Sequence, residues 1–320
     1  MTISTVVKRH LETGTSSVRH LLSTRDVTRH DVTRWMARAE ELRVMSAKDR
    51  QTILAGSVVA AIFYEPSTRT RLSFESAVLR LGGRVISAEN ALEHSSAKKG
   101  ERLEDVFRVL GCYADAIVIR HHENDAMAMA APQSPVPIIN AGAGSGEHPT
   151  QALLDVYTIW RELGQVDGLE ICIMGDLRYG RTVHSLLQLL TKYRNVSVTL
   201  LHPASLGLPE EMMQALRSRG LSIQTTQDLT SALSRADIVY QTRIQTERLS
   251  CIDEALGTEK FHLTSASLSV MKPSARILHP LPRVDEIHPE VDDDPRAAYF
   301  RQVENGLYMR MAILEDMVRR

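Results

Sequence analysis

The 320-residue chain contains little cysteine, and its positive and negative charges almost cancel. Its three cysteines, Cys112, Cys172 and Cys251, lie far apart and form no CxxC pair. So sparse and odd a set argues against a disulfide framework and against a zinc site, and is typical of a reducing compartment. The formal net charge of −1 gives no reason to expect a nucleic acid or an anionic membrane surface as a partner.

Long hydrophobic runs are also missing from the sequence. No stretch approaches the roughly 20 apolar residues that a membrane-spanning helix requires. Residues 1–15 are polar and of mixed charge, without the apolar core of a signal peptide. We therefore expect a cytoplasmic protein with no membrane partner and with a short N-terminal leader.

Short β-branched runs alternate with amphipathic stretches along most of the chain. We expect strands at 58–64, 84–88, 116–120, 136–140, 169–174, 196–201, 222–226, 237–242 and 275–278. We expect helices at 68–81, 102–113, 149–163, 181–192 and 210–219. This alternation predicts an α/β fold of doubly wound parallel sheets with helices on both faces.

The length of the chain favours two domains of about 150 residues rather than one core. We expect a first domain over residues 1–150 and a second over residues 151–295. The glycine-flanked segment 164–168 (GQVDG) is the strongest boundary signal. The amphipathic stretch 296–320 is expected to pack back on the first domain.

Arginine follows almost every predicted strand, although the whole chain is nearly neutral. Ligands of open parallel sheets bind beyond the carboxyl ends of the strands. At these ends the sequence places Arg69, Arg120, Arg181, Arg243 and Arg283. A cleft there would be strongly cationic and would suit substrates that carry several negative charges.

Segment 65–71 (EPSTRTR) has the features of a phosphate cradle. Ser67 is a suitable N-cap for the following helix, whose first N–H groups and dipole would then face the cleft. The hydroxyls of Thr68 and Thr70 and the guanidinium of Arg69 could add donors to a bound anion. On helix-start logic alone, these residues could equally well cap and solvate a helix.

Two further segments follow predicted strands. His148 begins a helix after the glycine-rich loop 141–147, whose glycines fit neither GxGxxG nor GxxxxGK[ST], so that a nucleotide site is weakly indicated. In segment 279–283 (HPLPR), two prolines remove backbone donors and leave carbonyl oxygens as acceptors. A rigid turn is the simpler interpretation of this segment, and the sequence leaves the 281–282 peptide bond open to either cis or trans.

Taken together, segments 63–71 (FYEPSTRTR), 140–155 (NAGAGSGEHPTQALLD) and 279–286 (HPLPRVDE) resemble the signature segments of aspartate carbamoyltransferase catalytic chains. The likeness extends from about residue 16 to residue 314. It implies the carbamoyltransferase fold and transfer of the carbamoyl group of carbamoyl phosphate to L-aspartate, with no cofactor and no metal. By the same resemblance, the first domain would bind carbamoyl phosphate and the second would bind aspartate.

The resemblance also assigns roles to individual residues. Carbamoyl phosphate would be bound by Ser67, Thr68, Arg69, Thr70, Arg120, His148, Gln151, Pro280 and Leu281. The catalytic residues among them would be Arg69, Thr70, Arg120 and His148. Aspartate would be bound by Lys99, Arg181, Arg243 and Gln245. In the family, a neighbouring subunit completes the site, and here loop 92–101 would contribute Ser95 and Lys99. A homotrimer with shared active sites is therefore expected, whereas regulatory chains or a dihydroorotase partner remain open.

Three alternatives compete with this interpretation. An ornithine or other carbamoyltransferase would share the phosphate half of the site, but the cysteine-containing HCLP segment of ornithine enzymes is replaced here by HPLP at 279–282. A catalytically inactive scaffold subunit would be expected to have lost a charged site residue, and none is lost. A dinucleotide-dependent oxidoreductase would need the glycine fingerprint that this chain lacks. The run His121-His122-Glu123 is expected to be a surface turn rather than a metal site.

Overall fold

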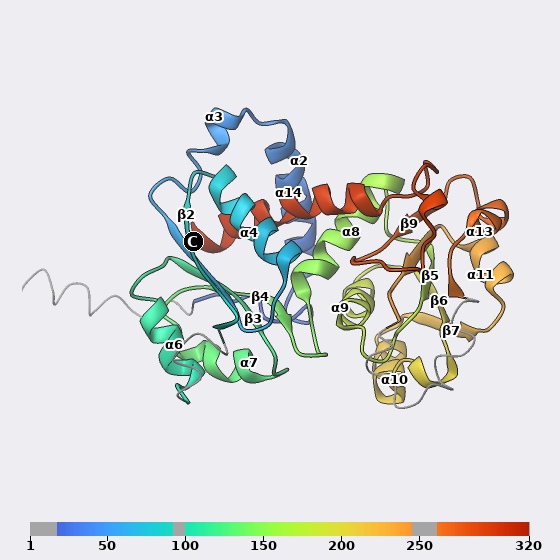
Figure 1. Cartoon of the computed structure of the whole chain (residues 1–320), viewed down its shortest axis with the longest axis horizontal. Helices are drawn as coiled ribbons and strands as arrows, with labels where there is room; N and C mark the ends of the chain where they lie inside the picture. The colour runs from blue at the N-terminus through green and yellow to red at the C-terminus, as the bar shows by residue number, and fades with distance from the viewer. Residues whose placement is uncertain (1–17, 92–99, 245–260, 320) are drawn as a thin grey trace, which may run out of the picture.

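The computed structural model describes residues 18–91, 100–244 and 261–319, which form two parallel sheets connected by long helices (Figure 1). The first sheet has the strand order β2-β1-β3-β4, with β2 at Arg84–Glu89, β1 at Val58–Phe63, β3 at Ala116–His121 and β4 at Ile138–Ala143. The second has the order β7-β6-β5-β8-β9, with β7 at Ser222–Thr226, β6 at Ser197–Leu201, β5 at Glu170–Met174, β8 at Ile238–Gln241 and β9 at Arg276–Leu278. The predicted α/β class with two parallel sheets is thus confirmed.

Helices occupy the connections between these strands, and further helices precede β1 and follow β9. They are α2 (Arg29–Val44), α3 (Ala47–Arg50), α4 (Thr68–Arg80), α6 (Leu103–Leu110), α7 (Ala126–Ala130), α8 (Pro149–Leu163), α9 (Arg181–Leu190), α10 (Glu210–Ser218), α11 (Leu229–Arg235), α13 (Ser265–Val270) and α14 (Tyr299–Val318). Every predicted strand and helix is present within three residues at each end. Within the described ranges, none of the helices has both the length and the apolar character needed to cross a bilayer.

Both faces of the central strands β1 and β3 are buried, as expected for parallel strands covered by helices, whereas the edge strands β2 and β7 are partly exposed. In β1, the odd-numbered residues 59–63 belong to an apolar core that includes Phe74 of α4. The even-numbered residues Ala60 and Ile62 belong to a second core that includes Phe107 of α6. The first of these cores continues through α8 and α9 into the second sheet. The predicted division of the chain at residues 150 and 151 stays a prediction.

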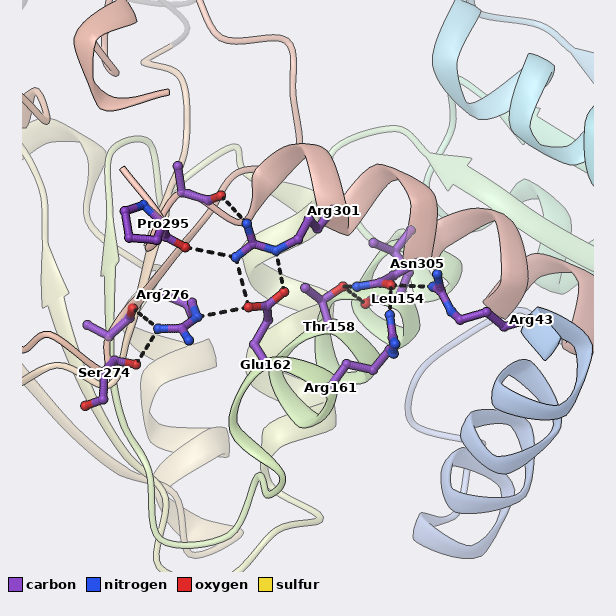
Figure 2. A network of polar contacts seen from close by, with 12 residues as sticks. Arg43, Leu154, Thr158, Arg161, Glu162, Ser274, Arg276, Pro295, Arg301 and Asn305 are labelled. Atoms are coloured by element: carbon purple, nitrogen blue, oxygen red, sulfur yellow. Dashed lines mark hydrogen bonds and ion pairs between the residues drawn. The ribbon is translucent and has the colours of Figure 1, made fainter. Parts of the chain in front are cut away.

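Helices α8 and α14 cross from one sheet to the other (Figure 1). Helix α14 packs on α2, α4 and α8, and its first turns contact β9. Figure 2 shows the polar contacts that fasten α14 to α8: the Glu162 carboxylate accepts from Arg276 at 2.9 Å and from Arg301 at 2.7 and 2.9 Å. Further along α14, the amide of Asn305 donates to the Thr158 hydroxyl at 3.2 Å. These contacts hold the two crossing helices together on the side away from the strand ends.

Gly82 ends α4 in a conformation that only glycine adopts without strain, with φ at +85°. A Cβ atom at this position would lie 1.7 Å from the carbonyl oxygen of Gln51. The backbone of the α3 end therefore approaches this turn too closely for any side chain. Gly56 has a similar φ of +88° but has no atom within 4 Å of the corresponding position.

We expect Gly82→Ala to lower the free energy of unfolding by more than Gly56→Ala. The left-handed backbone should cost both variants roughly 1–2 kcal/mol, and the clash with Gln51 should add about 1–3 kcal/mol to Gly82→Ala alone. Denaturant unfolding of both variants at equal protein concentration measures the difference. Equal losses would show that the turn relaxes away from Gln51.

Candidate active site

A cavity of about 490 Å³ lies at the carboxyl ends of strands from both sheets. Its walls come from the segments that follow β1, β5, β8 and β9, from the end of β3, from the start of α8 and from one side of α14. The predicted residues that line it are Ser67, Thr68, Arg69, Thr70, Arg120, His148, Gln151, Arg181, Arg243, Pro280 and Leu281. Ser95, Lys99 and Gln245 lie outside the described residues. The structure therefore brings together every described residue to which the family resemblance assigned a role. Arg283, also expected at a strand end of the cleft, is not among the lining residues and pairs instead with Asp292.

The start of α4 forms one wall of the cavity. Ser67 occupies the N-cap position, but among the described residues its side chain caps no N–H group of this helix. The predicted N-cap position of Ser67 is therefore confirmed, whereas its side chain leaves the first N–H groups of the helix uncapped. The first N–H groups of α4 and the positive end of its dipole face the cavity without a side-chain cap, as an anion site requires.

Four guanidinium groups from strand ends, those of Arg69, Arg120, Arg181 and Arg243, share this cavity. One Glu65 oxygen lies 3.3 Å from Nε of Arg120 and 3.5 Å from Nη1 of Arg181, so that a carboxylate after β1 touches an arginine that begins α9. Burial, followed by the charge of Arg181, lowers the pKa of Arg120 to about 10. Burial likewise lowers the pKa of Arg69. A bound anion would relieve both the burial cost and the mutual repulsion of these cations.

His148 is buried at the entry to α8, with 4% of its surface exposed. Burial lowers the pKa of its imidazole well below the ordinary value, and the positive charges of Arg181 and Arg120 lower it further. Its backbone N–H donates to Oγ of Ser185 at 2.8 Å, which fixes the residue at the cavity wall. At neutral pH the ring is therefore neutral, with one N–H to donate and one nitrogen to accept.

His279 holds in place the segment that follows β9. The N–H of Leu281 donates to Nδ1 of His279 at 2.8 Å, and Nε2 of His279 lies 2.7 Å from the Glu286 carboxylate. The Leu281-Pro282 peptide bond, which the sequence left open, is cis. Pro280 and Leu281 lie at the cavity wall, where proline cannot offer an N–H.

Arg310 of α14 is a cavity residue that the sequence analysis missed. It is buried, its Nη1 donates to Oγ of Ser73 at 2.8 Å, and its guanidinium lies 5.2 Å from the ring centre of Phe74. Burial lowers its pKa to about 10. In the sequence, Arg310 lies inside a long helix and does not follow a strand, so the strand-end rule does not find it. A single arginine within the apolar run 307–314 (LYMRMAIL) was the available signal.

Asp155, one turn after Gln151 on α8, was also missed. Its side chain is completely buried and accepts hydrogen bonds from Gln151, Gln302 and Tyr240 at 2.8, 2.6 and 2.8 Å. Burial raises the pKa of this carboxyl to about 7, and the three hydrogen bonds oppose the shift. A carboxyl that titrates near neutrality therefore lies directly behind the cavity wall.

Asp155→Asn should change how stability depends on pH. The folded pKa near 7 exceeds the ordinary value of 3.8, so the native state binds a proton that the unfolded chain releases between these limits. The free energy of unfolding of the wild type should therefore fall as the pH rises from about 4 to about 7. The loss amounts to about 1.4 kcal/mol for each unit of pKa shift, or a few kcal/mol in all. Asparagine cannot titrate, so the free energy of unfolding of the variant should not fall in this way. Measured at several pH values, the difference between the two proteins should shift in favour of the variant as the pH rises. Parallel pH curves for the two proteins would contradict the raised pKa.

The run 121–123 differs from its prediction as a surface turn. His121 ends β3 and is buried, with its ring centre 4.8 Å from that of Tyr64 and 4.3 Å from that of His122. His122 and Glu123 are exposed, as expected. Across the described part of the chain, three or more His, Cys, Asp or Glu side chains nowhere converge in a way that could hold a metal ion.

Comparisons with known proteins agree with this geometry. The family described as "Aspartate/ornithine carbamoyltransferase, carbamoyl-P binding domain" matches residues 19–161, and the one described as "Aspartate/ornithine carbamoyltransferase, Asp/Orn binding domain" matches residues 167–317. Aspartate carbamoyltransferase 1 of Pisum sativum, named chloroplastic, is 51% identical over 83% of this chain and 69% of its own length. The aspartate carbamoyltransferase catalytic subunit of Thermococcus onnurineus is 46% identical over 92% of this chain and 96% of its own.

The chain is also similar to solved structures of aspartate transcarbamoylases. The catalytic subunit of M. jannaschii aspartate transcarbamoylase superposes with a TM-score of 0.88 at 42% identity, over 94% of this chain and 98% of that one. Aspartate transcarbamoylase of Trypanosoma cruzi in complex with carbamoyl phosphate and aspartate superposes with a TM-score of 0.87 at 39% identity, over 93% and 95% of the two chains.

Proposed function

The chain belongs to the aspartate/ornithine carbamoyltransferase family, and we propose that its strand-end cavity transfers the carbamoyl group of carbamoyl phosphate to the α-amine of L-aspartate. The products are N-carbamoyl-L-aspartate and phosphate, an early step of de novo pyrimidine biosynthesis. The relatives named aspartate carbamoyltransferase and the T. cruzi neighbour with both substrates bound support this choice.

One observation carries the proposal: four arginines from the two sheets share a single cavity. Carbamoyl phosphate brings a phosphate, and aspartate brings two carboxylates. Guanidinium groups bind both kinds of anion in a bidentate manner. The segments after β1 and β3 offer Arg69 and Arg120, whereas the segments after β5 and β8 offer Arg181 and Arg243. A phosphate and a diacid can therefore lie side by side in the cavity.

In the reaction, the aspartate amine attacks the carbonyl carbon and forms a C–N bond. The tetrahedral intermediate then breaks its bond to the phosphate oxygen, and the nitrogen gives up its proton to the departing phosphate. Negative charge grows on the carbonyl oxygen and on the leaving phosphate. In this proposal the start of α4 with Arg69 stabilises the phosphate, and Arg120 stabilises both developing charges. Loss of one such donor costs about 3 kcal/mol, or ~100-fold in rate.

Neutral His148 complements these cations. As a neutral donor it gives a hydrogen bond to the carbonyl oxygen of carbamoyl phosphate without requiring a proton transfer. Burial lowers the pKa of this imidazole, and three neighbouring positive charges lower it further, so that the ring is neutral at neutral pH. Its role is therefore polarisation of the carbonyl group rather than acid–base catalysis.

The choice of amino acid is the decisive test. Purified protein given carbamoyl phosphate should release phosphate with aspartate and should show no release above background with ornithine. Two arginines favour a dicarboxylate and oppose a side chain that carries an ammonium group. Faster turnover with ornithine would refute the assignment, and no turnover with either amino acid would indicate an inactive scaffold subunit.

We expect Arg243→Ala to weaken aspartate binding by about 10²-fold while carbamoyl phosphate binding stays within about twofold, because Arg243 follows a strand of the second sheet. Calorimetric titration of each ligand measures the split. Arg178→Ala is the matched control, since this exposed arginine is not among the residues that line the cavity, and it should affect neither ligand. Similar losses for both ligands in Arg243→Ala would contradict a divided site.

We further propose a homotrimer in which loop 92–101 supplies Ser95 and Lys99 to a neighbouring site. The family resemblance supports this. Mixing Arg69→Ala chains with Lys99→Ala chains should restore part of the activity, because some hybrid sites then contain both native residues. Hybrids no more active than the parents would contradict sharing. The cytoplasmic location and the regulatory or dihydroorotase partners stay predictions.

A further inference from the structure

We propose that Asp155 is a positioning residue that makes the site selective for a carbamoyl group over an acyl group of the same size. This inference rests on the proposed function. The carbamoyl NH₂ carries two N–H donors, and a methyl group in its place carries none. Selectivity between the two therefore depends on where the cavity presents hydrogen-bond acceptors.

The carboxylate of Asp155 connects three elements behind the cavity. Its Oδ1 accepts from Nε2 of Gln151 on α8 at 2.8 Å and from Nε2 of Gln302 on α14 at 2.6 Å. Its Oδ2 accepts from the hydroxyl of Tyr240 on β8 at 2.8 Å. Asp155 is fully buried and is not among the residues that line the cavity, so it acts through these neighbours.

The contacts settle which way each amide faces. The backbone N–H of His279 can only donate, and it donates to Oε1 of Gln302 at 2.9 Å, so Nε2 of Gln302 must face Asp155. Oδ1 of Asp155 already accepts from Gln302, and Gln151 also offers it Nε2. A proton on Oδ2 of Asp155 would leave both bonds to Oδ1 in place.

Gln151 reaches the cavity and lies four residues before Asp155 on α8. Because its Nε2 is bound to the carboxylate, its Oε1 is the atom left to accept a hydrogen bond from a ligand. Gln302 meanwhile holds the backbone of His279, from which Pro280 and Leu281 extend along the cavity wall. One carboxylate thus orients a side-chain acceptor directly and a carbonyl-bearing segment through a single relay.

Helices α8 and α14 are also joined by the contacts of Figure 2, which do not depend on Asp155. Glu162 joins α8 to Arg276 and Arg301, and Asn305 joins α14 to Thr158, without involving Asp155. Replacing Asp155 should therefore leave α8 and α14 paired while freeing the amide of Gln151 to rotate.

The test compares carbamoyl phosphate with acetyl phosphate as donor to aspartate. In Asp155→Leu, kcat/KM should fall for carbamoyl phosphate much more than for acetyl phosphate, lowering their ratio by about tenfold or more. Asp155→Asn keeps an acceptor at the Oδ1 position and should hold the ratio within about threefold. Tyr240→Phe is the matched control, because it removes a bond to the same carboxylate on the side of Oδ2, and it should leave the ratio unchanged.

An unchanged ratio in Asp155→Leu, or an equal fall in Tyr240→Phe, would overturn the proposal. If Asp155→Leu does not fold, Gln302→Met carries the test, since it cuts the relay to His279 and should lower the ratio in the same direction; an unchanged ratio there would be equally decisive. Wild-type protein without carbamoyl transfer to aspartate would instead refute the proposed function, so the two failures are distinguishable.

Discussion

The convergence of partly buried guanidinium groups in one cavity is the feature that governs the chemistry of this structure. Burial and neighbouring positive charge lower the pKa of Arg120, and burial lowers that of Arg310, yet both remain cations near neutrality. Glu65 offsets part of the charge, and the carbonyl oxygen of Gly144 accepts from Arg181 at 2.6 Å. The remaining field favours anions, so the cavity is prepared electrostatically before any substrate arrives.

The fold explains how such a field can exist in a chain with a net charge of −1. Arginines elsewhere are matched with carboxylates, as Arg276 and Arg301 are with Glu162. At the strand ends of two adjoining parallel sheets, in contrast, cations from distant segments converge on one cavity. Burial lowers the pKa of His148, and the same field lowers it further, which links the binding of anions to the polarisation of a carbonyl group.

Much of this was predictable from the sequence, for definable physical reasons. Buried parallel strands leave continuous β-branched runs, and the strand-end rule then gathered Arg69, Arg120 and Arg181 without any knowledge of strand order. Asp155 and Arg310 escaped prediction because each lies within a long helix and becomes part of the site only when α8 and α14 pack together. The geometry at Ser67 and the burial of His121 likewise depend on backbone angles and packing that residue type does not determine.

The central claim is that one crevice holds a phosphate and a diacid next to each other. A crystal structure with a ligand that joins a phosphonoacetyl group to aspartate tests it most directly. The account predicts the phosphonate within hydrogen-bond distance of Arg69 and Arg120, and the two carboxylates within the same reach of Arg181 and Arg243. A ligand bound elsewhere, or with its carboxylates on the first sheet, would contradict it.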